Sequence, residues 1–344
     1  MSISPYALIL KIRHLLYDKG VKKSKSADTF TICVGNITVG GTGKTPHTEM
    51  LIRMLGNEMR LGVLSRGYKR KGKGFAFVNP EGGASQYGDE PVQIKRNFPD
   101  TVVAVDKSRL HGIQEMEKMP EDKRPRAIIL DDAFQYRKLK PAFSILLIDW
   151  NRPLNKDRLL PFGRLRDLPS RLKEADIIIA TKCPPYITAA EAEEWAAEAG
   201  LADCGKPVFY TSIEYDKPKP VFPEGDMRYS YSSRVILFTG IANDRPMKQY
   251  LSEYYKIMRD ISFPDHHKYS RRDIRNIRSM SDSNPTALVL TTEKDAQRIM
   301  ERTDIPKELK NKLFFLPIKT RFLFPEQEKK FKEMLLSSRD TYII

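Results

Sequence analysis

Short runs of β-branched and aliphatic residues alternate with more polar segments through the first two thirds of the chain. Each run is continuously apolar, a pattern typical of parallel strands that are buried on both faces of a sheet. Strands are expected near residues 30–36, 61–65, 101–106, 126–131, 144–149 and 176–181. Helices are expected to start near residues 45, 89, 107, 167 and 188. The alternation predicts an α/β fold with a parallel sheet and helices on both faces, in which ligands bind at the carboxyl ends of the strands.

The pattern changes near residue 215, where Lys217-Pro218-Lys219-Pro220 is typical of a linker. Beyond it, the strands of a smaller α/β unit are predicted by apolar runs near 235–238, 256–258, 286–290 and 313–316. The chain is thus expected to comprise an N-terminal helix (1–26), a core domain (27–215), a linker (216–233) and a smaller C-terminal α/β domain (234–344). Two domains joined by a hinge are expected to enclose a cleft.

The N-terminal segment has the periodicity of an amphipathic helix. Leu8, Ile12, Leu15 and Leu16 share one helical face, and several lysines follow the segment. The opposite face carries Lys11, His14 and Asp18. Such a helix is suited to lie in the interface of an anionic membrane, and equally to pack on the core of its own protein. No run reaches the roughly 18 to 20 apolar residues that a membrane-spanning helix needs.

Composition indicates a globular protein with a large core and an anionic partner. The chain has 344 residues, of which 40% are hydrophobic, and a formal net charge of +15. This excess of positive charge favours nucleic acid, an anionic membrane surface or a phosphorylated substrate, and does not choose among them. Three widely spaced cysteines argue against a disulfide framework or a zinc site.

A glycine-rich turn, Gly40-Gly41-Thr42-Gly43-Lys44-Thr45-Pro46, follows the first expected strand. Glycines allow backbone N–H groups to turn toward phosphate oxygens, while the lysine supplies charge and the Thr45 hydroxyl is placed to bind Mg²⁺. Pro46 fits the first turn of a helix, whose positive end would face the phosphates. The usual first glycine of this motif is replaced by Thr38. The segment predicts a nucleotide phosphate site in a P-loop NTPase-like core.

A second candidate motif is an apolar strand that ends in Asp131-Asp132, with Gln135 three residues on. In phosphate-loop enzymes an acidic strand end lies beside the phosphate cradle and organises the Mg²⁺ shell. Aspartates at strand ends also serve as turn or helix caps, so the motif gains weight from its pairing with the phosphate loop.

Asp89 opens a helix after a glycine-rich stretch, in Gly88-Asp89-Glu90-Pro91. Two readings are open for this residue. It could accept the proton of an attacking hydroxyl, as the catalytic aspartate of a kinase does, but from the sequence alone the preferred interpretation is a helix N-cap.

Two basic loops follow other expected strands. The first, residues 65–74, contains Arg66 and Tyr68, and the tyrosine could stack on a base or close the site. The second, residues 160–167, contains Arg164 and Arg166, whose guanidinium groups are suited to phosphate oxygens. Both loops are also compatible with ordinary solvated surface.

The second unit contributes two further motifs. Asp265-His266 is either a surface pair or a partner that reaches across the cleft to tune a catalytic carboxylate. Thr292-Glu293-Lys294-Asp295 has the form of a helix-capping box and is interpreted as structural, with a possible ligand contact. Thr181-Lys182 stands where a GTPase would carry its guanine-binding motif, but the asparagine and aspartate of that motif are missing.

Taken together and in this order, these motifs resemble the tetraacyldisaccharide 4'-kinase (lipid A 4'-kinase) family of Gram-negative bacteria. The resemblance extends from the N-terminal helix to the last expected strand, and the incomplete phosphate loop is also found in the family. The chain departs from it where Asp131-Asp132-Ala133 replaces the more usual Asp-Asp-Gly, because alanine disfavours a positive φ. Asp167 stands where the family often has glutamate.

The resemblance implies ATP- and Mg²⁺-dependent phosphorylation of the 4'-hydroxyl of a tetraacyl glucosamine disaccharide 1-phosphate. It implies Asp89 as general base, His266 as its partner across the cleft, Lys44 as the phosphate ligand and Tyr68 as part of a flap. Gly40, Gly41, Thr42, Gly43, Lys44 and Thr45 would bind the nucleotide. Thr45, Asp131, Asp132 and Gln135 would organise the metal. The substrate is expected to meet Asn36, Arg66, Arg164, Arg166 and Asp167.

The expected partners are the lipid substrate and the anionic inner-membrane surface, met peripherally on its cytoplasmic face through the N-terminal helix. Neither nucleic acid nor an obligate protein partner is expected. The net charge and the basic loop support one alternative, a nucleic-acid-dependent NTPase. A nucleotide-gated switch with negligible transfer activity is another alternative, although the missing guanine motif counts against a GTPase.

Overall fold

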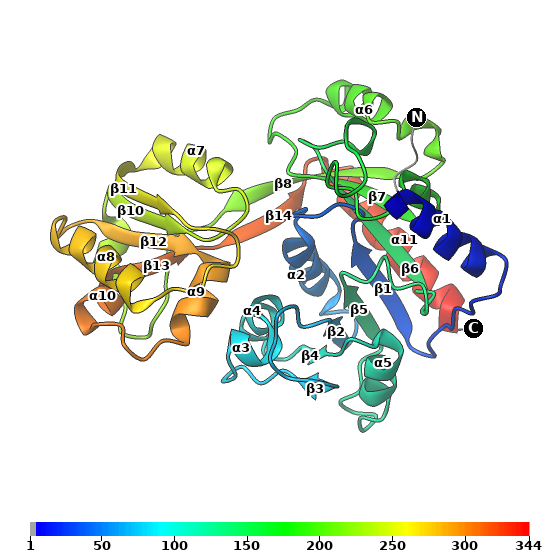
Figure 1. The fold of residues 1–344 in the computed structure, drawn as a ribbon, viewed down its shortest axis with the longest axis horizontal. Coiled ribbons are helices and arrows are strands. Elements are labelled where there is room, and N and C mark those ends of the chain that lie inside the picture. Colours follow the sequence, from blue (N-terminus) through cyan, green and yellow to red (C-terminus); the bar gives the residue numbers. More distant parts are fainter. Residues whose placement is uncertain (1–4, 344) are drawn as a thin grey trace.

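The computed structural model describes residues 5–343, which form two lobes, each built on its own sheet (Figure 1). The strands of the larger lobe are β1 (Phe30–Gly35), β2 (Leu61–Ser65), β3 (Ala76–Phe77), β4 (Val102–Val105), β5 (Ala127–Asp131), β6 (Phe143–Asp149), β7 (Ile177–Thr181), β8 (Val208–Tyr215) and β14 (Ile318–Phe322). Those of the smaller lobe are β9 (Lys219–Pro220), β10 (Arg234–Thr239), β11 (Lys256–Ser262), β12 (Leu288–Thr292) and β13 (Leu313–Leu316).

The larger lobe and its edges carry the helices α1 (Pro5–Asp18), α2 (Lys44–Leu55), α3 (Ala84–Tyr87), α4 (Asp89–Asn97), α5 (Arg109–Glu117), α6 (Ala189–Glu198) and α11 (Pro325–Ile343). The smaller lobe carries α7 (Arg245–Tyr254), α8 (Arg271–Asp282), α9 (Glu293–Met300) and α10 (Lys307–Lys312). Short 3₁₀ turns are η1 (Leu154–Lys156), η2 (Pro169–Glu174), η3 (Ala202–Cys204) and η4 (Met227–Tyr231).

The nine-stranded sheet has the order β14-β8-β7-β6-β1-β5-β2-β4-β3, and the five-stranded sheet has the order β11-β10-β12-β13-β9. Neighbouring strands are parallel except where the edge strands β14, β3 and β9 pair in antiparallel fashion. The predicted P-loop-type parallel α/β fold with a second, smaller α/β unit is confirmed.

Both faces of the larger sheet are covered, which is why its strands are apolar throughout. Along β1, Ile32 faces one apolar cluster and Cys33 faces the other. Helices α2 and α11 cover the first face, with Leu51 and Phe331 in its cluster. Helix α5 covers the second face, where Met116 is fully buried. The alternation of neighbouring side chains across a strand therefore places α2, which follows the glycine-rich turn, firmly against the sheet.

One predicted helix is wrong. The helix expected to start near residue 167 is instead the six-residue 3₁₀ turn η2, which begins at Pro169. The connection has to reach β7 at Ile177, and Asp167 is already used in a buried contact described below. The other helices start at Lys44, Asp89, Arg109 and Ala189, within two residues of the predictions.

The predicted boundary of the C-terminal unit at 234–344 also needs correction. Strand β14 leaves the smaller lobe and pairs with β8 from Ile318↔Tyr215 to Phe322↔Thr211, and α11 then packs on the larger sheet. These two strands run side by side between the lobes (Figure 1). The chain therefore crosses the hinge twice, because the apolar side chains of β14 and α11 complete the larger core. The expected linker 216–233 is partly core as well, since Val221 and Phe222 are buried in the smaller lobe.

Helix α1 lies against the larger lobe through Ala7, Leu10 and His14, which are buried. Leu8, Ile12 and Leu15 are each about half exposed. Of the expected N-terminal segment 1–26, residues 1–4 lie outside the described part of the chain. The described helix therefore packs on the protein through one face and leaves most of the expected apolar face exposed.

Candidate active site

The glycine-rich turn between β1 and α2 has the backbone shape that its composition predicts. Gly40 has φ 108° and Gly43 has φ 87°, values that are strained for any residue with a Cβ. The Thr42 N–H donates to the Gly40 carbonyl at 3.0 Å, which tightens the turn. Lys44 is the first residue of α2, so the turn ends at the positive end of a helix that is anchored in the core.

Side chains from two neighbouring strands brace this turn. The Thr181 hydroxyl at the end of β7 donates to the Thr42 carbonyl at 3.0 Å. Lys182 donates to the Gly41 carbonyl and lies 2.6 Å from the carboxylate of Asp149, at the end of β6. From the sequence, Thr181-Lys182 is notable only as the place where a guanine-binding motif is missing. In the structure, this pair fixes the conformation of the phosphate loop.

Asn36 corrects one prediction for the substrate site. Its side chain is fully buried and donates to the hydroxyl of Thr42 at 2.8 Å. The backbone carbonyl of Asn36 accepts a hydrogen bond from the side-chain amide of Gln135 at 3.3 Å. Asn36 therefore supports the inside of the loop instead of facing a substrate, and Gln135 holds the backbone beside it.

Two oxygen atoms near the loop are buried and have no hydrogen-bond partner within residues 5–343. They are the Thr45 hydroxyl and Oδ1 of Asp131. The other oxygen of Asp131 accepts from Ser65 at 3.2 Å. Burial, with Glu90 and Asp132 nearby, raises the pKa of Asp131 to about 7, so its charge lacks compensation. A hydroxyl and a carboxylate left free in this way fit Mg²⁺, which takes oxygen ligands and usually shares them with substrate phosphates.

Asp132 has different neighbours from Asp131. Arg166 contacts both of its oxygens, with Nη1 3.1 Å from Oδ2, and Lys44 lies 3.8 Å from Oδ1. Burial alone would raise the pKa of Asp132, but Lys44 and Arg166 outweigh it and hold the pKa below its ordinary value. Within the described chain, no group of three or more His, Cys, Asp or Glu side chains is arranged to hold a metal by itself.

Ala133, which stands where the family usually has glycine, does not adopt a positive φ. The left-handed residue is Asp132, with φ 49°, and not Ala133. The Ala133 methyl is buried in the apolar cluster on the second face of the sheet. The turn therefore places its backbone strain on an aspartate, a residue type that tolerates this conformation better than most.

The loop over 160–167 lies beside the phosphate loop. The Val39 N–H donates to the Arg164 carbonyl at 2.7 Å, and the Arg166 N–H donates to the Ile37 carbonyl at 2.8 Å. The side chain of Arg164 is exposed. Asp167 is fully buried and contacts His14 of α1 at 2.6 Å, so the prediction that it meets the substrate is replaced by a contact that anchors α1.

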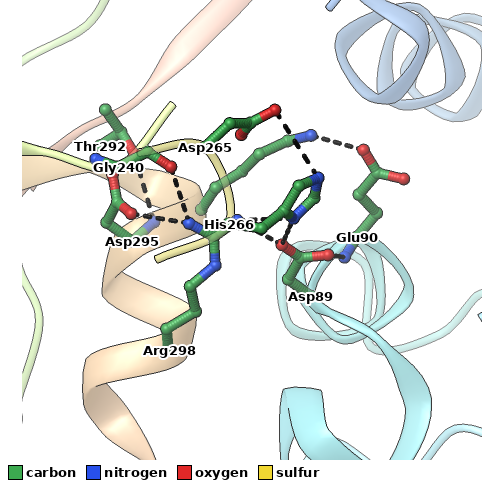
Figure 2. Close-up of polar contacts among 9 residues, drawn as sticks. Asp89, Glu90, Gly240, Asp265, His266, Thr292, Asp295 and Arg298 are labelled. Atoms are coloured by element: carbon green, nitrogen blue, oxygen red, sulfur yellow. Dashed lines mark hydrogen bonds and ion pairs between the residues drawn. The ribbon is translucent and has the colours of Figure 1, made fainter. Parts of the chain in front are cut away.

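The first acidic residue of α4 meets the smaller lobe. Asp89 is the first residue of this helix, and Gly88 occupies the N-cap position, so the N-cap interpretation of Asp89 is wrong. Oδ2 of Asp89 lies 3.3 Å from Nδ1 of His266 and 2.5 Å from Nη2 of Arg298 (Figure 2). Burial would raise the pKa of Asp89, but His266, Lys294 and Arg298 outweigh it and hold the pKa far below its ordinary value.

A second ion pair lies beside the first. Glu90 of α4 and Lys294 of α9 are in contact, and both side chains are mostly buried (Figure 2). Lys294, with help from Lys44, holds the pKa of Glu90 below its ordinary value, and Glu90 in turn helps to raise that of Asp131. The interlobe pairs and the phosphate loop are thus within electrostatic reach of one another.

Tyr68 lies at the edge of the same site. Its ring is 57% exposed, and its centroid is 5.5 Å from that of His266. The neighbouring Arg66 is exposed. The structure thus brings the predicted flap residue next to the histidine of the other lobe, and leaves Arg66 accessible at the surface.

Thr292 is the N-cap of α9, as the sequence predicts, and it accepts a hydrogen bond from the Asp295 N–H at 3.2 Å. Lys294 and Arg298 make contacts across the lobes that were not predicted from the sequence. The signal was present: two basic residues four positions apart share one face of a helix and match the acidic pair Asp89-Glu90.

The chain is similar over nearly its whole length to known proteins. A family model described as tetraacyldisaccharide-1-P 4'-kinase matches residues 3–339. The tetraacyldisaccharide 4'-kinase of Parabacteroides distasonis is 39% identical, over 98% of this chain and 93% of that protein. The tetraacyldisaccharide 4'-kinase of Phocaeicola vulgatus is also 39% identical, over 92% of this chain and 88% of that protein. A crystal structure of LpxK from Aquifex aeolicus in complex with ATP is 29% identical, with a TM-score of 0.72, over 97% of this chain and 96% of that one. The chain therefore belongs to the tetraacyldisaccharide 4'-kinase family.

Proposed function

We propose that this chain transfers the γ-phosphoryl group of ATP to the 4'-hydroxyl of a tetraacyl glucosamine disaccharide 1-phosphate, a step of lipid A biosynthesis. The observation that carries the proposal is the meeting of Asp89 from one lobe with His266 from the other, at 3.3 Å, within electrostatic reach of the phosphate loop. The family match over nearly the whole chain supports the same reaction.

The phosphate loop would hold the nucleotide. Lys44, at the start of α2, supplies positive charge for the β- and γ-phosphates, and the glycines before it allow close approach of the backbone. Thr45 and Asp131 would hold Mg²⁺ through their free oxygens, with Asp132 beside them. When bound, the ion neutralises charge on the phosphates during transfer. Arg166, which is held by Asp132, is placed to meet a phosphate of the nucleotide or of the substrate.

Asp89 would act as the general base. As the oxygen of the sugar hydroxyl forms its bond to the γ-phosphorus, its proton passes to Asp89, and the bond to the bridging oxygen breaks so that ADP leaves. The cations around Asp89 hold this side chain as a carboxylate in the free enzyme. His266 would be its partner from the other lobe, with Tyr68 as a flap over the nucleotide.

The experiment is to replace Asp89 by asparagine and to follow the phosphorylated lipid by mass spectrometry with ATP, Mg²⁺ and the disaccharide lipid. Loss of a general base lowers kcat by about 10²- to 10⁴-fold. Binding of ATP should be nearly unchanged, because Asp89 lies outside the phosphate loop. Asp100→Asn, an exposed aspartate just beyond the other end of α4, is the control and should keep full activity. Near-normal turnover by Asp89→Asn, or ATP hydrolysis that depends on nucleic acid and not on lipid, would contradict the proposal.

Helix α1 would place the enzyme on the cytoplasmic face of the inner membrane. Exposed fractions of about 50% at Leu8, Ile12 and Leu15 and of 63% at Ile9 leave an apolar stripe uncovered. No helix within the described residues is long and apolar enough to cross a bilayer. A helix with one apolar face and lysines after it is suited to lie in an anionic interface, which also brings the active site to a lipid acceptor.

The membrane proposal is tested with vesicles that contain about one third anionic lipid. Replacing Leu8, Ile12 and Leu15 by serine should lower the bound fraction at least tenfold, since each side chain contributes on the order of 1 kcal/mol when it enters the interface. Activity on a short-chain, detergent-soluble acceptor should be retained. Serine at three exposed apolar sites of the smaller lobe, Met227, Tyr231 and Tyr254, serves as the matched control set. Equal vesicle binding by all proteins would overturn the membrane role of α1.

A further inference from the structure

Arg298 of α9 contacts four groups of the interlobe site at once (Figure 2). Its Nη1 donates to Asp295 at 2.8 Å and to the Gly240 carbonyl at 3.0 Å. Its Nη2 lies 2.5 Å from Asp89 Oδ2 and 3.2 Å from His266 Nδ1. The side chain is only 11% exposed, so water competes weakly for these contacts. A single guanidinium therefore joins both members of the pair that the proposed function uses.

The position of this guanidinium is fixed by its contact with Asp295, on the side away from Asp89 (Figure 2). Asp295 is fully buried, and its second oxygen accepts from the Gly240 N–H at 2.8 Å and from the Thr292 hydroxyl at 2.6 Å. If Arg298 turned away, the buried Asp295 carboxylate would lose its only ion-pair partner within residues 5–343. Removing one member of a buried ion pair is strongly unfavourable. Arg298 is thus held at Asp89 by residues that take no part in the chemistry.

The contact with His266 restricts where the imidazole carries its proton. A guanidinium nitrogen can only donate, so the bond from Arg298 to Nδ1 requires an unprotonated Nδ1. The proton of the neutral ring is then on Nε2, which lies 3.8 Å from the carboxylate of Asp265. A proton on Nδ1 would instead point at Asp89 and occupy the oxygen lone pair that has to accept the hydroxyl proton.

Charges from every neighbouring element bear on Asp89. The groups that face it are Glu90 on its own helix, Lys294, Asp295 and Arg298 on α9, and His266 and Asp265 in the loop after β11. Each carboxylate oxygen can accept more than one hydrogen bond. Arg298 can therefore compensate the charge of Oδ2 and leave a lone pair for the substrate.

We propose that Arg298 is a positioning residue of the phosphoryl transfer, which holds Asp89 as a carboxylate and keeps the proton of neutral His266 on Nε2. The inference rests on the proposed function, in which Asp89 is the base. It adds a residue that acts through Asp89 and His266, and it assigns the tautomer of the histidine.

The first test observes the histidine directly and needs no turnover. Nitrogen-15 NMR of histidine-labelled protein distinguishes the two neutral tautomers, and His266→Gln identifies the signal. The wild-type protein is expected to show His266 protonated on Nε2, and Arg298→Gln to show a proton on Nδ1. Glutamine still donates to Asp295, which protects the fold. Arg302→Gln, one turn further on and bound to Asp304 and the Tyr269 carbonyl, is the matched control and should match wild type. A wild-type His266 protonated on Nδ1 would overturn the inference without any variant.

The second test separates kcat from KM. Arg298→Gln removes contacts that fix Asp89 and His266 relative to each other, so kcat should fall about 10- to 100-fold. Arg298→Lys should restore part of kcat, and the KM for ATP should stay within twofold in both variants. An unchanged kcat in Arg298→Gln would refute the positioning role. If Asp89→Asn turned over normally, the proposed base would fail, while the NMR result would still decide what Arg298 does.

Discussion

At the scale of single residues, the site depends on side chains that hold the backbone of the phosphate loop. Lys182 is the clearest case, because its ammonium group joins the Gly41 carbonyl to the carboxylate of Asp149. Lys182 itself has φ 57°, a left-handed conformation that few residues adopt. Backbone strain in this region is usually kept only where surrounding contacts enforce it, so this residue shapes the loop that would bind the nucleotide.

Lys182→Met should therefore weaken ATP binding more than it weakens the fold. A hydrogen bond from a charged group is worth about 1.5–3 kcal/mol, so the KM for ATP should rise at least tenfold. Steady-state kinetics with varied ATP and saturating lipid measure this change. Lys173→Met, which alters an exposed lysine of η2, is the control. A KM for ATP within twofold of wild type would show that the loop holds its shape without Lys182.

At the scale of elements, α1 is the unusual part, because it packs on the protein through Ala7, Leu10 and His14 and leaves larger apolar side chains exposed. Arg137 donates to the backbone carbonyl of His14 and lies 3.2 Å from Nδ1 of the same residue. Nε2 of His14 lies 2.6 Å from the carboxylate of Asp167. The Tyr6 hydroxyl donates to the Arg166 carbonyl at 2.9 Å, and Arg13 donates to the Gln135 carbonyl at 2.8 Å. The helix is therefore fastened to the two loops that carry residues of the site.

His14→Ala should release α1 from the larger lobe. The change leaves Asp167 buried with fewer donors, at a cost on the order of 2 kcal/mol. Tryptic cleavage in the lysine-rich segment after α1 should then become at least tenfold faster, as followed by mass spectrometry. His111→Ala is the matched control, since His111 also lies 2.6 Å from an aspartate but is exposed. Equal cleavage rates in His14→Ala and wild type would show that other contacts of α1 suffice.

At the scale of the whole molecule, the two lobes meet through polar contacts between α4 and α9, while β8 and β14 connect them. One of these contacts contains two acids: the Asn97 amide donates to Glu49 at 3.1 Å and to Glu293 of the other lobe at 2.8 Å. Burial, with Glu49 close by, raises the pKa of Glu293 to about 7, and burial raises that of Glu49 as well. The closed arrangement therefore favours a protonated Glu293.

The sign of the pH dependence follows from this. A raised pKa in the folded state gives a stability that is fully present below pH 4.5, the ordinary value, and lost as the pH rises through about 7. Glu293→Gln should remove this contribution, so the loss of stability over that window should be smaller than in wild type, with a gain on the order of 2 kcal/mol at pH 8. Glu308→Gln, an exposed change on α10, is the control. Parallel stability profiles of Glu293→Gln and wild type would contradict the assignment.

The sequence by itself determined those parts whose physical cause is local. Continuous apolar runs require strands buried on both faces, and the glycines before Lys44 require a turn with positive φ at the start of a helix. The acidic strand end and Asp89 at the start of α4 could be placed in the same way. Asn36 and Asp167 could not, because their types suit a substrate site and only burial shows that they are used inside the protein.

Tertiary structure decided what depends on residues far apart in the chain. The apolar pattern predicts that α1 is amphipathic, but tertiary contacts such as that of His14 with Asp167 decide which face is turned toward the protein. Strand β14 and helix α11 return to the larger sheet because their apolar side chains pack in its core. Arg298 reaches Asp89 only because the lobes fold against each other, since no local propensity relates positions 209 residues apart.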